Sequence, residues 1–176
     1  MRLEPTPFSG LHVIHSAPNC DERGYFHRLF DAEAFAAAGV RFNIRQSGLS
    51  RNIRARTLRG MHYQKSPAAQ AKLVRCLKGR LFDVAIDLRR HSATFCQSFT
   101  CELAGEDGRA LHIPAGFAHG FLTLEDMTDI LYELDAVEDP ALAAGVRWND
   151  ARFNIHWPAE PAVINARDAA WPNFTD

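Results

Sequence analysis

The chain has 176 residues, which fits one domain, so residues 1–176 are treated as a single domain. Hydrophobic residues make up 47% of the chain and charged residues 23%, a composition typical of a globular protein with a large core. The 20 Lys and Arg residues nearly balance the 21 Asp and Glu residues, and the net charge of −1 argues against a nucleic-acid binder held mainly by charge.

The predicted elements begin with one short helix and continue as strands. Residues 31–38 fit a helix that Asp31 caps and Gly39 ends. The chain after it has many short apolar runs separated by turn signals, which indicates an antiparallel sandwich or barrel, and a jelly roll fits the spacing best. The strand candidates are residues 73–77, 81–88, 95–103, 110–113 and 128–134. We expect the C-terminal third, rich in aromatic residues, to form an irregular cover on the barrel.

Residues 81–88 alternate regularly, with the period of two that a strand requires. One face carries the larger apolar side chains, Phe82, Val84, Ile86 and Leu88. The other face carries Asp83, Ala85 and Asp87.

Targeting and cysteine patterns favour a cytoplasmic protein. No apolar run approaches the ~20 residues of a membrane-spanning helix, and the N-terminus lacks the apolar core of a signal peptide. The four cysteines include no C-x-x-C pair, so we expect free core thiols rather than disulfides or a zinc site. The sequence therefore predicts no membrane partner and no nucleic-acid partner.

Two segments and two single residues carry side chains suited to chemistry. Residues 57–64 contain His62 and Gln64, which point to the same face if the segment is a strand. Residues 113–121 place His119 among apolar neighbours, and Lys72 and Tyr132 lie in or beside strand candidates. Taken singly, each also fits a structural role as a core imidazole, a surface lysine or a core tyrosine.

The spacing of these residues resembles the two motifs of the cupin superfamily. One motif appears as Gly108, Pro114, Gly116 and His119, with Thr123 where an asparagine usually closes it. The other motif normally supplies His-x-His, then Glu and Gly, and ends here at Gly79. The resemblance implies a cupin jelly-roll barrel.

The second cupin motif departs from the usual metal-ligating pattern. Its positions read His62, Gln64 and Lys72, so an ammonium stands where a carboxylate ligand is usual. A cation at that place opposes a bound divalent ion, and His62 and His119 alone are too few ligands for a tight site. We therefore predict a barrel that holds no metal, and a metal-dependent cupin enzyme remains the weakest alternative.

A closer resemblance, to the dTDP-4-dehydrorhamnose 3,5-epimerase family, covers nearly the whole chain. The matching stretches are residues 21–26, 58–64, 72–75, 82–89, 113–121 and 148–150. The resemblance implies a cofactor-free homodimer that inverts the carbons beside a ketone in a nucleotide-diphosphate sugar. It also makes an N-terminal strand exchanged between subunits a reasonable expectation, from the residues before Arg23.

The resemblance assigns catalytic roles that suit this chemistry. His62 resembles the family's base, because an imidazole removes a weakly acidic proton near neutral pH. Asp168 is expected to orient that imidazole, and Lys72 to stabilise the enolate oxygen. Tyr132 resembles the acid that returns a proton from the opposite face.

The resemblance also assigns substrate-binding residues. Arg23, Arg59 and Arg167 match positions near the nucleotide diphosphate, where planar guanidinium groups pair with phosphate oxygens. Gln46 and His119 match positions that line the pocket. Phe26 is a candidate surface for stacking.

Four pocket positions depart from the family pattern. Arg28 and Ala143 stand where the family usually has Glu, Gly48 where it usually has Asn, and Val137 where it often has an aromatic residue. Two alternatives follow: the pocket binds dTDP through other contacts, or the substrate is a different nucleotide or deoxysugar, with one carbon inverted or both. A non-catalytic sugar-nucleotide-binding module is the further alternative.

Overall fold

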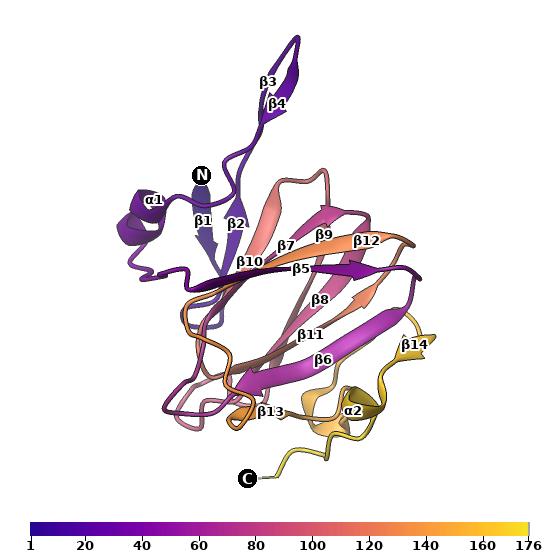
Figure 1. Cartoon of the computed structure of the whole chain (residues 1–176). Coiled ribbons are helices and arrows are strands. Elements are labelled where there is room, and N and C mark those ends of the chain that lie inside the picture. Colours follow the sequence, from indigo (N-terminus) through magenta and orange to yellow (C-terminus); the bar gives the residue numbers. More distant parts are fainter. Residues whose placement is uncertain (176) are drawn as a thin grey trace.

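The protein is described from a computed structural model that covers residues 1–175 and consists of two antiparallel sheets packed face to face (Figure 1). The first sheet has the order β1 (Arg2–Pro5), β2 (His12–His15), β10 (Arg109–Ile113), β7 (Lys72–Lys78), β12 (Thr128–Leu134) and β5 (Gln46–Asn52). The second sheet has the order β13 (Ala143–Gly145), β6 (Thr57–Gln64), β11 (Phe117–Thr123), β8 (Arg80–Asp87) and β9 (Ser98–Ala104), and β14 (Val163–Ile164) pairs with β6 in parallel.

The remaining elements are short and lie outside the two sheets. They are a hairpin of β3 (Asn19–Asp21) and β4 (Gly24–Phe26), the helices α1 (Ala32–Ala37) and α2 (Ala166–Ala169), and the 3-10 helix η1 (Ala151–Phe153). Asp31 caps α1 as predicted, because its side chain accepts hydrogen bonds from the backbone N–H groups of Glu33 and Ala34. No helix in residues 1–175 has the length and apolarity to cross a membrane.

The chain crosses repeatedly between the sheets, which confirms the predicted all-β jelly-roll class. From β5 to β12, successive strands lie in opposite sheets except for the β8–β9 pair. The turn at Lys78–Gly79 therefore joins strands of different sheets. Gly79 has a φ of 76°, in the left-handed region that glycine tolerates, and a Cβ there would lie 2.5 Å from Thr128 Oγ1.

The alternation in β8 sorts its side chains between two clusters. Leu81 and Ala85 join the core between the sheets, whereas Val84 and Ile86 pack beneath the C-terminal cover. Trp148, Phe153 and Trp157 belong to that cover, as the sequence predicted. Each buried side chain of Leu or Phe size contributes about 1.5–3 kcal/mol relative to exposure.

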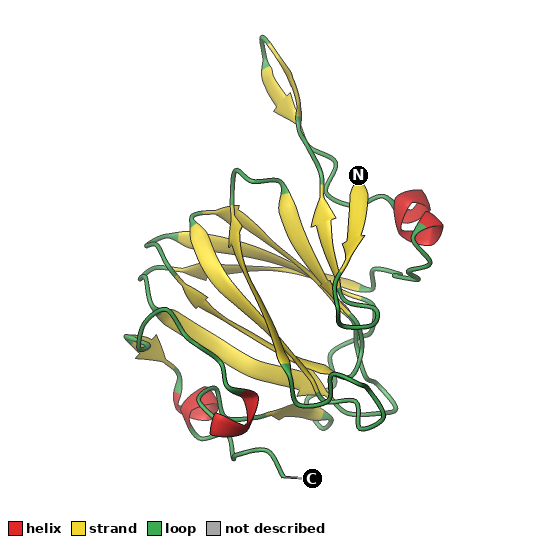
Figure 2. Ribbon diagram, turned by 180° about the vertical axis from the view of Figure 1, so that it is seen from behind, coloured by secondary structure: helices red, strands yellow, loops and turns green. Residues whose placement is uncertain are grey.

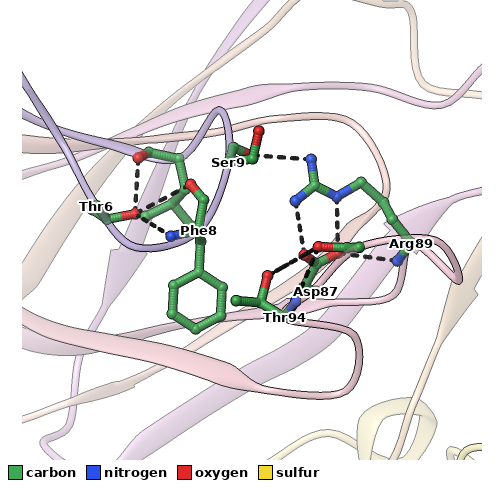
Figure 3. A network of polar contacts seen from close by, with 8 residues as sticks. Thr6, Phe8, Ser9, Asp87, Arg89 and Thr94 are labelled. Carbon is green, nitrogen blue, oxygen red and sulfur yellow. Dashed lines mark hydrogen bonds and ion pairs between the residues drawn. The ribbon is translucent and has the colours of Figure 1, made fainter.

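A polar network ties the N-terminal loop to the end of β8 (Figure 3). Asp87 is fully buried and accepts hydrogen bonds from Arg89, Ser92 and Thr94. Burial alone would raise the pKa of Asp87, but these hydrogen bonds outweigh it and hold the pKa at about 2. Arg89 also donates to the backbone oxygen of Ser9 at 3.0 Å, so one buried carboxylate organises both segments.

The β3–β4 hairpin projects away from the barrel, and Figure 2 shows the same projection from behind. Its aromatic side chains are unusually exposed, Tyr25 at 73% and Phe26 at 65%. Figure 2 also shows that α1 and α2 lie at opposite ends of the barrel.

Two sequence expectations are wrong. The predicted strand 95–103 begins only at Ser98, because the chain turns before it and Cys96 takes a φ of 62°. The four cysteines are unpaired, but Cys20 lies exposed on the hairpin rather than in the core. Its strand alternates only over three residues, too few for a burial pattern to be read from the sequence.

Candidate active site

A histidine on β6 and an aspartate on α2, from distant parts of the chain, form a dyad. His62 Nε2 lies 2.7 Å from Asp168 Oδ1, and the backbone N–H of Gly60 donates to Asp168 Oδ2 at 3.0 Å. Asp168 is 1% exposed, whereas the His62 side chain is 39% exposed. The carboxylate is therefore fixed, and the imidazole reaches the cavity, where its Nδ1 has no hydrogen-bond partner among residues 1–175.

Helix α2 positions the acid of this dyad. Asn165 caps the helix, and its side chain accepts the backbone N–H of Asp168 at 2.7 Å. Burial raises the pKa of Asp168, but the hydrogen bonds from His62 and from the Gly60 N–H outweigh it and lower the pKa overall. The carboxylate thus stays ionised, as a partner for an imidazolium should.

Trp171 covers the dyad, a contact that the sequence did not predict. The indole and imidazole rings meet edge to face with centroids 6.4 Å apart. The indole packs against the backbone of Gly145, where a Cβ would lie 2.3 Å from the ring. The guanidinium of Arg167 lies 5.2 Å from the indole centroid, so the cover also orients a predicted phosphate-binding residue.

Lys72 lies on β7 in the opposite sheet and is 9% exposed. Its Nζ donates to the backbone oxygen of His62 at 3.2 Å. Burial lowers the pKa of Lys72 to about 8, opposed by the negative charges of Asp83 and Glu138. The lysine is therefore a buried cation beside the dyad, rather than a surface residue.

Tyr132 lies on β12, next to Lys72's strand, and its ring is 6.1 Å from that of His119. Burial and the charge of Asp83 raise the pKa of Tyr132 well above 10, against the opposing effect of Arg59. The phenol is consequently protonated at neutral pH. His62 and Tyr132 come from facing sheets, so a ligand between the sheets meets a base on one side and an acid on the other.

A second histidine–aspartate pair lies deeper in the barrel. His119 Nε2 is 2.7 Å from Asp83 Oδ1, and the two residues are 4% and 0% exposed. His119 lies opposite His62 in the β11–β6 ladder. The sequence placed Asp83 on the polar face of its strand, and the structure shows that this face points into the barrel.

Two cavities share three lining residues, which are His62, Lys72 and Tyr132. The larger has a volume of about 420 Å³ and the smaller about 240 Å³. The other residues of the larger are Gln46, Ser47, Gly48, Tyr63, Gln64, Gln70, Leu134, Glu138, Ala143, Ala144 and Arg167. The other residues of the smaller are Ser50, Arg59, His119 and Phe121.

The structure brings most of the predicted site residues together, with two exceptions. Gln46, Arg59, His119 and Arg167 line one cavity or the other, beside the four proposed catalytic residues. Arg23 and Phe26 instead lie on the projecting hairpin, where Arg23 pairs with Asp21. Within this chain they line neither cavity.

The four departures from the family pattern separate into two pairs. Gly48 and Ala143 line the larger cavity, and a Cβ at Gly48 would meet no atom within 4 Å. Arg28 instead forms an ion pair with Asp31 at the start of α1, and Val137 is exposed and accepts a hydrogen bond from Gln64 through its backbone oxygen. The first pair alone bears directly on the shape of the cavity.

Comparisons with known proteins agree with this geometry. The sequence model of the dTDP-4-dehydrorhamnose 3,5-epimerase family matches residues 5–176. A protein of that name from Shigella flexneri is 38% identical over 157 residues, covering 89% of this chain and 86% of the relative.

Solved structures give the same result. An epimerase of that name from Bacillus anthracis, with TDP and PPi bound, has a TM-score of 0.95 at 33% identity and covers 98% of this chain and 99% of its own. A dTDP-6-deoxy-D-glucose-3,5-epimerase from Legionella pneumophila, in complex with dTDP-4-keto-L-rhamnose, has a TM-score of 0.92 at 36% identity. The match covers 98% of this chain and 92% of the Legionella chain.

Proposed function

This chain belongs to the dTDP-4-dehydrorhamnose 3,5-epimerase family, and on that basis we propose that it inverts C3 and C5 of a nucleotide-activated 4-keto-6-deoxyhexose. The reaction is of the type that converts dTDP-4-dehydro-6-deoxy-D-glucose to dTDP-4-dehydro-L-rhamnose. One observation carries the proposal: an ordered base, His62, and a protonated acid, Tyr132, reach the same cavities from opposite sheets.

The first step is removal of a proton from a carbon beside the ketone. His62 accepts that proton, and the C–H electron pair forms the enolate with its negative charge on the ketone oxygen. Asp168 stabilises the resulting imidazolium through the 2.7 Å contact. Lys72, buried and cationic, stabilises the enolate oxygen, where a fixed charge in a dry site is most effective.

The second step is protonation from the other face. Tyr132 donates its phenolic proton to the same carbon, the enolate returns to the ketone, and the stereocentre is inverted. The phenolate and the imidazolium then regain neutrality by proton exchange with solvent, and the cycle repeats at the second carbon. Every proton moves among the substrate carbon, the two side chains and solvent, so we expect activity without a cofactor and in the presence of a metal chelator.

The arginines support binding of the nucleotide diphosphate. Arg167 lines the larger cavity and Arg59 the smaller one, and both cavities are also lined by His62, Lys72 and Tyr132. Their forked guanidinium groups suit paired phosphate oxygens.

Four unpaired cysteines fit the reducing cytoplasm, where we expect the protein to act.

We also propose a homodimer in which each hairpin serves the partner's site. Arg23 and Phe26 lie away from the cavities of their own chain, on a hairpin with exposed aromatic residues. Strand β5 pairs only with β12 within residues 1–175, so its outer edge is open, and its residues Gln46, Ser47 and Gly48 line the larger cavity. A hairpin from a second copy laid along that edge brings an arginine and a phenyl ring to the cavity.

A second candidate, a mono-epimerase or an enzyme for a differently substituted sugar, rests on Gly48 and Ala143. Both leave space in the larger cavity that longer side chains would fill. Such space admits a substituent or a sugar orientation that a narrower site excludes.

Proton NMR in deuterated water tests the proposal. The protein is incubated with dTDP-4-keto-6-deoxyglucose, and the sugar protons beside the ketone are followed while a reductase traps the inverted product. Loss of both signals with an inverted product supports the 3,5-epimerase, and loss of one supports the mono-epimerase. Folded protein that exchanges neither proton would contradict this substrate and direct the test to other nucleotide sugars.

A further inference from the structure

Asp83 is a fully buried carboxylate that the proposed proton transfers do not use. Its Oδ1 lies 2.7 Å from His119 Nε2, while its buried Oδ2 has no hydrogen-bond partner anywhere in residues 1–175. A buried charge with an unpaired oxygen costs free energy that a well-packed apolar side chain would not. Stability alone therefore gives no reason for this residue.

The contact with His119 fixes the tautomer of that ring. An ionised carboxylate only accepts hydrogen bonds, so the ring must carry a proton on Nε2 and donate it to Asp83. In a neutral ring the other nitrogen, Nδ1, is then an acceptor. His119 lines the smaller cavity with Lys72 and Tyr132, so this acceptor belongs to the site.

The charge of Asp83 acts on two further groups of the same cavity. It opposes the effect of burial on Lys72, whose pKa is about 8. It adds to the effect of burial in raising the pKa of Tyr132. Both effects keep a proton on the group that the proposed mechanism needs protonated.

Other charged and titratable groups also face Lys72 from neighbouring elements. Asp83 differs from them because it also bonds the ring of His119, which lines the smaller cavity. Those groups are Arg59 and His62 on β6, His119 on β11, Tyr132 on β12, Glu138 in the following loop and Arg167 on α2.

We propose that Asp83 is a positioning residue, which fixes His119 as a hydrogen-bond acceptor for a substrate hydroxyl and keeps Lys72 an ammonium beside the enolate oxygen. The inference rests on the proposed function, because it assigns the substrate contacts to that reaction. In this proposal Asp83 acts on His119 and Lys72, whereas Asp168 acts on the base, His62.

Two substitutions separate the charge from the hydrogen bond. Asp83→Asn removes the charge but keeps a carbonyl oxygen that accepts from His119 Nε2. Asp83→Leu, of similar shape, removes both. Asp87→Asn is the matched control, because Asp87 is equally buried on the same strand and the same face but bonds Arg89, Ser92 and Thr94 outside the site.

The pH profile of kcat is the first readout. Asp83→Asn removes a negative charge near the Lys72 ammonium, which should lower the pKa of Lys72 by about one unit or more. The alkaline limb of Asp83→Asn should move down by the same amount, so that kcat falls about eightfold at pH 8.5 and by less than twofold at pH 6.5. Asp83→Leu should lose activity across the whole range, and Asp87→Asn should keep the wild-type profile.

A purely structural role predicts a different pattern. Asp83→Asn would then lose stability and lose activity equally at all pH values, with the alkaline limb unmoved. That outcome would overturn the proposal.

Nitrogen-15 NMR of the ligand-free protein tests the proposal without any turnover. His119 should carry its proton on Nε2 in the wild type and in Asp83→Asn, and the Lys72 ammonium should titrate at lower pH in Asp83→Asn, with Lys72→Met identifying its signal. An Nδ1 proton in the wild type, or an unchanged Lys72 titration, would overturn the inference.

These spectra remain decisive if the substrate assay shows no exchange in the wild type, a result that would contradict only the proposed function. If Asp83→Asn does not fold, the wild-type tautomer and the Asp83→Leu titration decide.

Discussion

His62 depends on a single carboxylate for its orientation, and this dependence gives the first prediction. Asp168→Asn should leave the fold intact but lower the rate of deuterium exchange by about 10³–10⁴-fold, because the amide no longer stabilises the imidazolium. His62→Ala should abolish exchange at both carbons. Proton NMR in deuterated water measures both variants.

A matched control tests whether any buried carboxylate of the C-terminal cover has this effect. Asp150 is also buried and accepts the backbone N–H of Phe174 at 2.7 Å, but it lines neither cavity. Asp150→Asn should keep the exchange rate of the wild type once its folded fraction is taken into account. Wild-type exchange by His62→Ala would contradict the assignment of the base.

Tyr132 separates exchange from inversion. Tyr132→Phe keeps the ring that packs against His119 and Phe121 but removes the proposed proton donor. The variant should exchange the proton beside the ketone at a rate within about tenfold of wild type, whereas inversion falls by about 10² or more. Inverted product formed as fast as exchange would show that another group is the acid.

His112 predicts how stability depends on pH. The ring is 4% exposed on β10, meets Phe35 and Phe42 edge to face, and leaves Nε2 without a partner in residues 1–175. Burial lowers its pKa from 6.5 to about 4, against a hydrogen bond with Gly10. The unfolded chain therefore binds the proton first, and stability is lost as the pH falls from about 6.5 to 4, by up to about 3 kcal/mol.

Urea unfolding between pH 7.5 and 4.5 measures this loss. His112→Gln should flatten the pH dependence, whereas His91→Gln, at an exposed position in a turn, should not. Equal slopes for His112→Gln and the wild type would contradict the assignment.

At the scale of elements, β6 and β11 approach so closely that only glycine fits between them. Gly60 has a φ of 132°, and a Cβ there would lie 2.5 Å from the Cα of Gly120. Gly60→Ala should therefore lower the free energy of unfolding by about 2 kcal/mol or more. Gly48→Ala, where a Cβ meets open space, should change it by less than about 1 kcal/mol. Equal effects in urea unfolding would mean that β6 moves to relieve the clash.

The sequence predicts elements well where a pattern is long enough to repeat. Residues 128–134 form β12 as predicted, and Asp31 begins α1 because its cap is a local signal. The strands β1 to β4 have only three or four residues each and carry no usable period. Which strands share a sheet also cannot be predicted locally, because it depends on contacts between distant segments.

The candidate site divides along the same lines. His62, Lys72 and Tyr132 were predicted, by family resemblance, to act together, and they line shared cavities. Their roles stay predictions until the variants are measured. Asp83 was missed as a site residue, because a carboxylate that alternates with apolar residues on a strand is typical of a solvent-facing side. Trp171 was missed because its contact with His62 crosses more than a hundred residues of chain.

At the scale of the whole molecule, the proposed exchange of the hairpin between subunits predicts complementation between two inactive variants. Arg23→Ala should weaken substrate binding and His62→Ala should remove the base, so each homodimer should be defective. If the hairpin serves the partner's site, a mixed dimer has one site with neither defect. Random pairing of equal amounts should then restore about a quarter of the wild-type sites.

The measurement is the exchange rate of the two variants after co-refolding, compared with the same proteins mixed without refolding. Recovery only after co-refolding supports exchange of the hairpin. No recovery, with dimers confirmed by light scattering, would mean that Arg23 acts within its own chain or not at all.

The position of Asp168 along the chain has a consequence for how the protein becomes active during its synthesis. Every strand described in residues 1–175 except β14 precedes residue 146, whereas the acid of the dyad lies 106 residues after His62. At ribosomal speeds, this acid is added about 5 to 20 seconds after the base. A chain interrupted once β13 is made has thirteen of the fourteen strands in residues 1–175 but lacks the group that orients its base. The dyad is thus completed only after the strands of both sheets except β14 have been translated, so a chain interrupted before residue 168 should exchange protons far more slowly than the 176-residue chain.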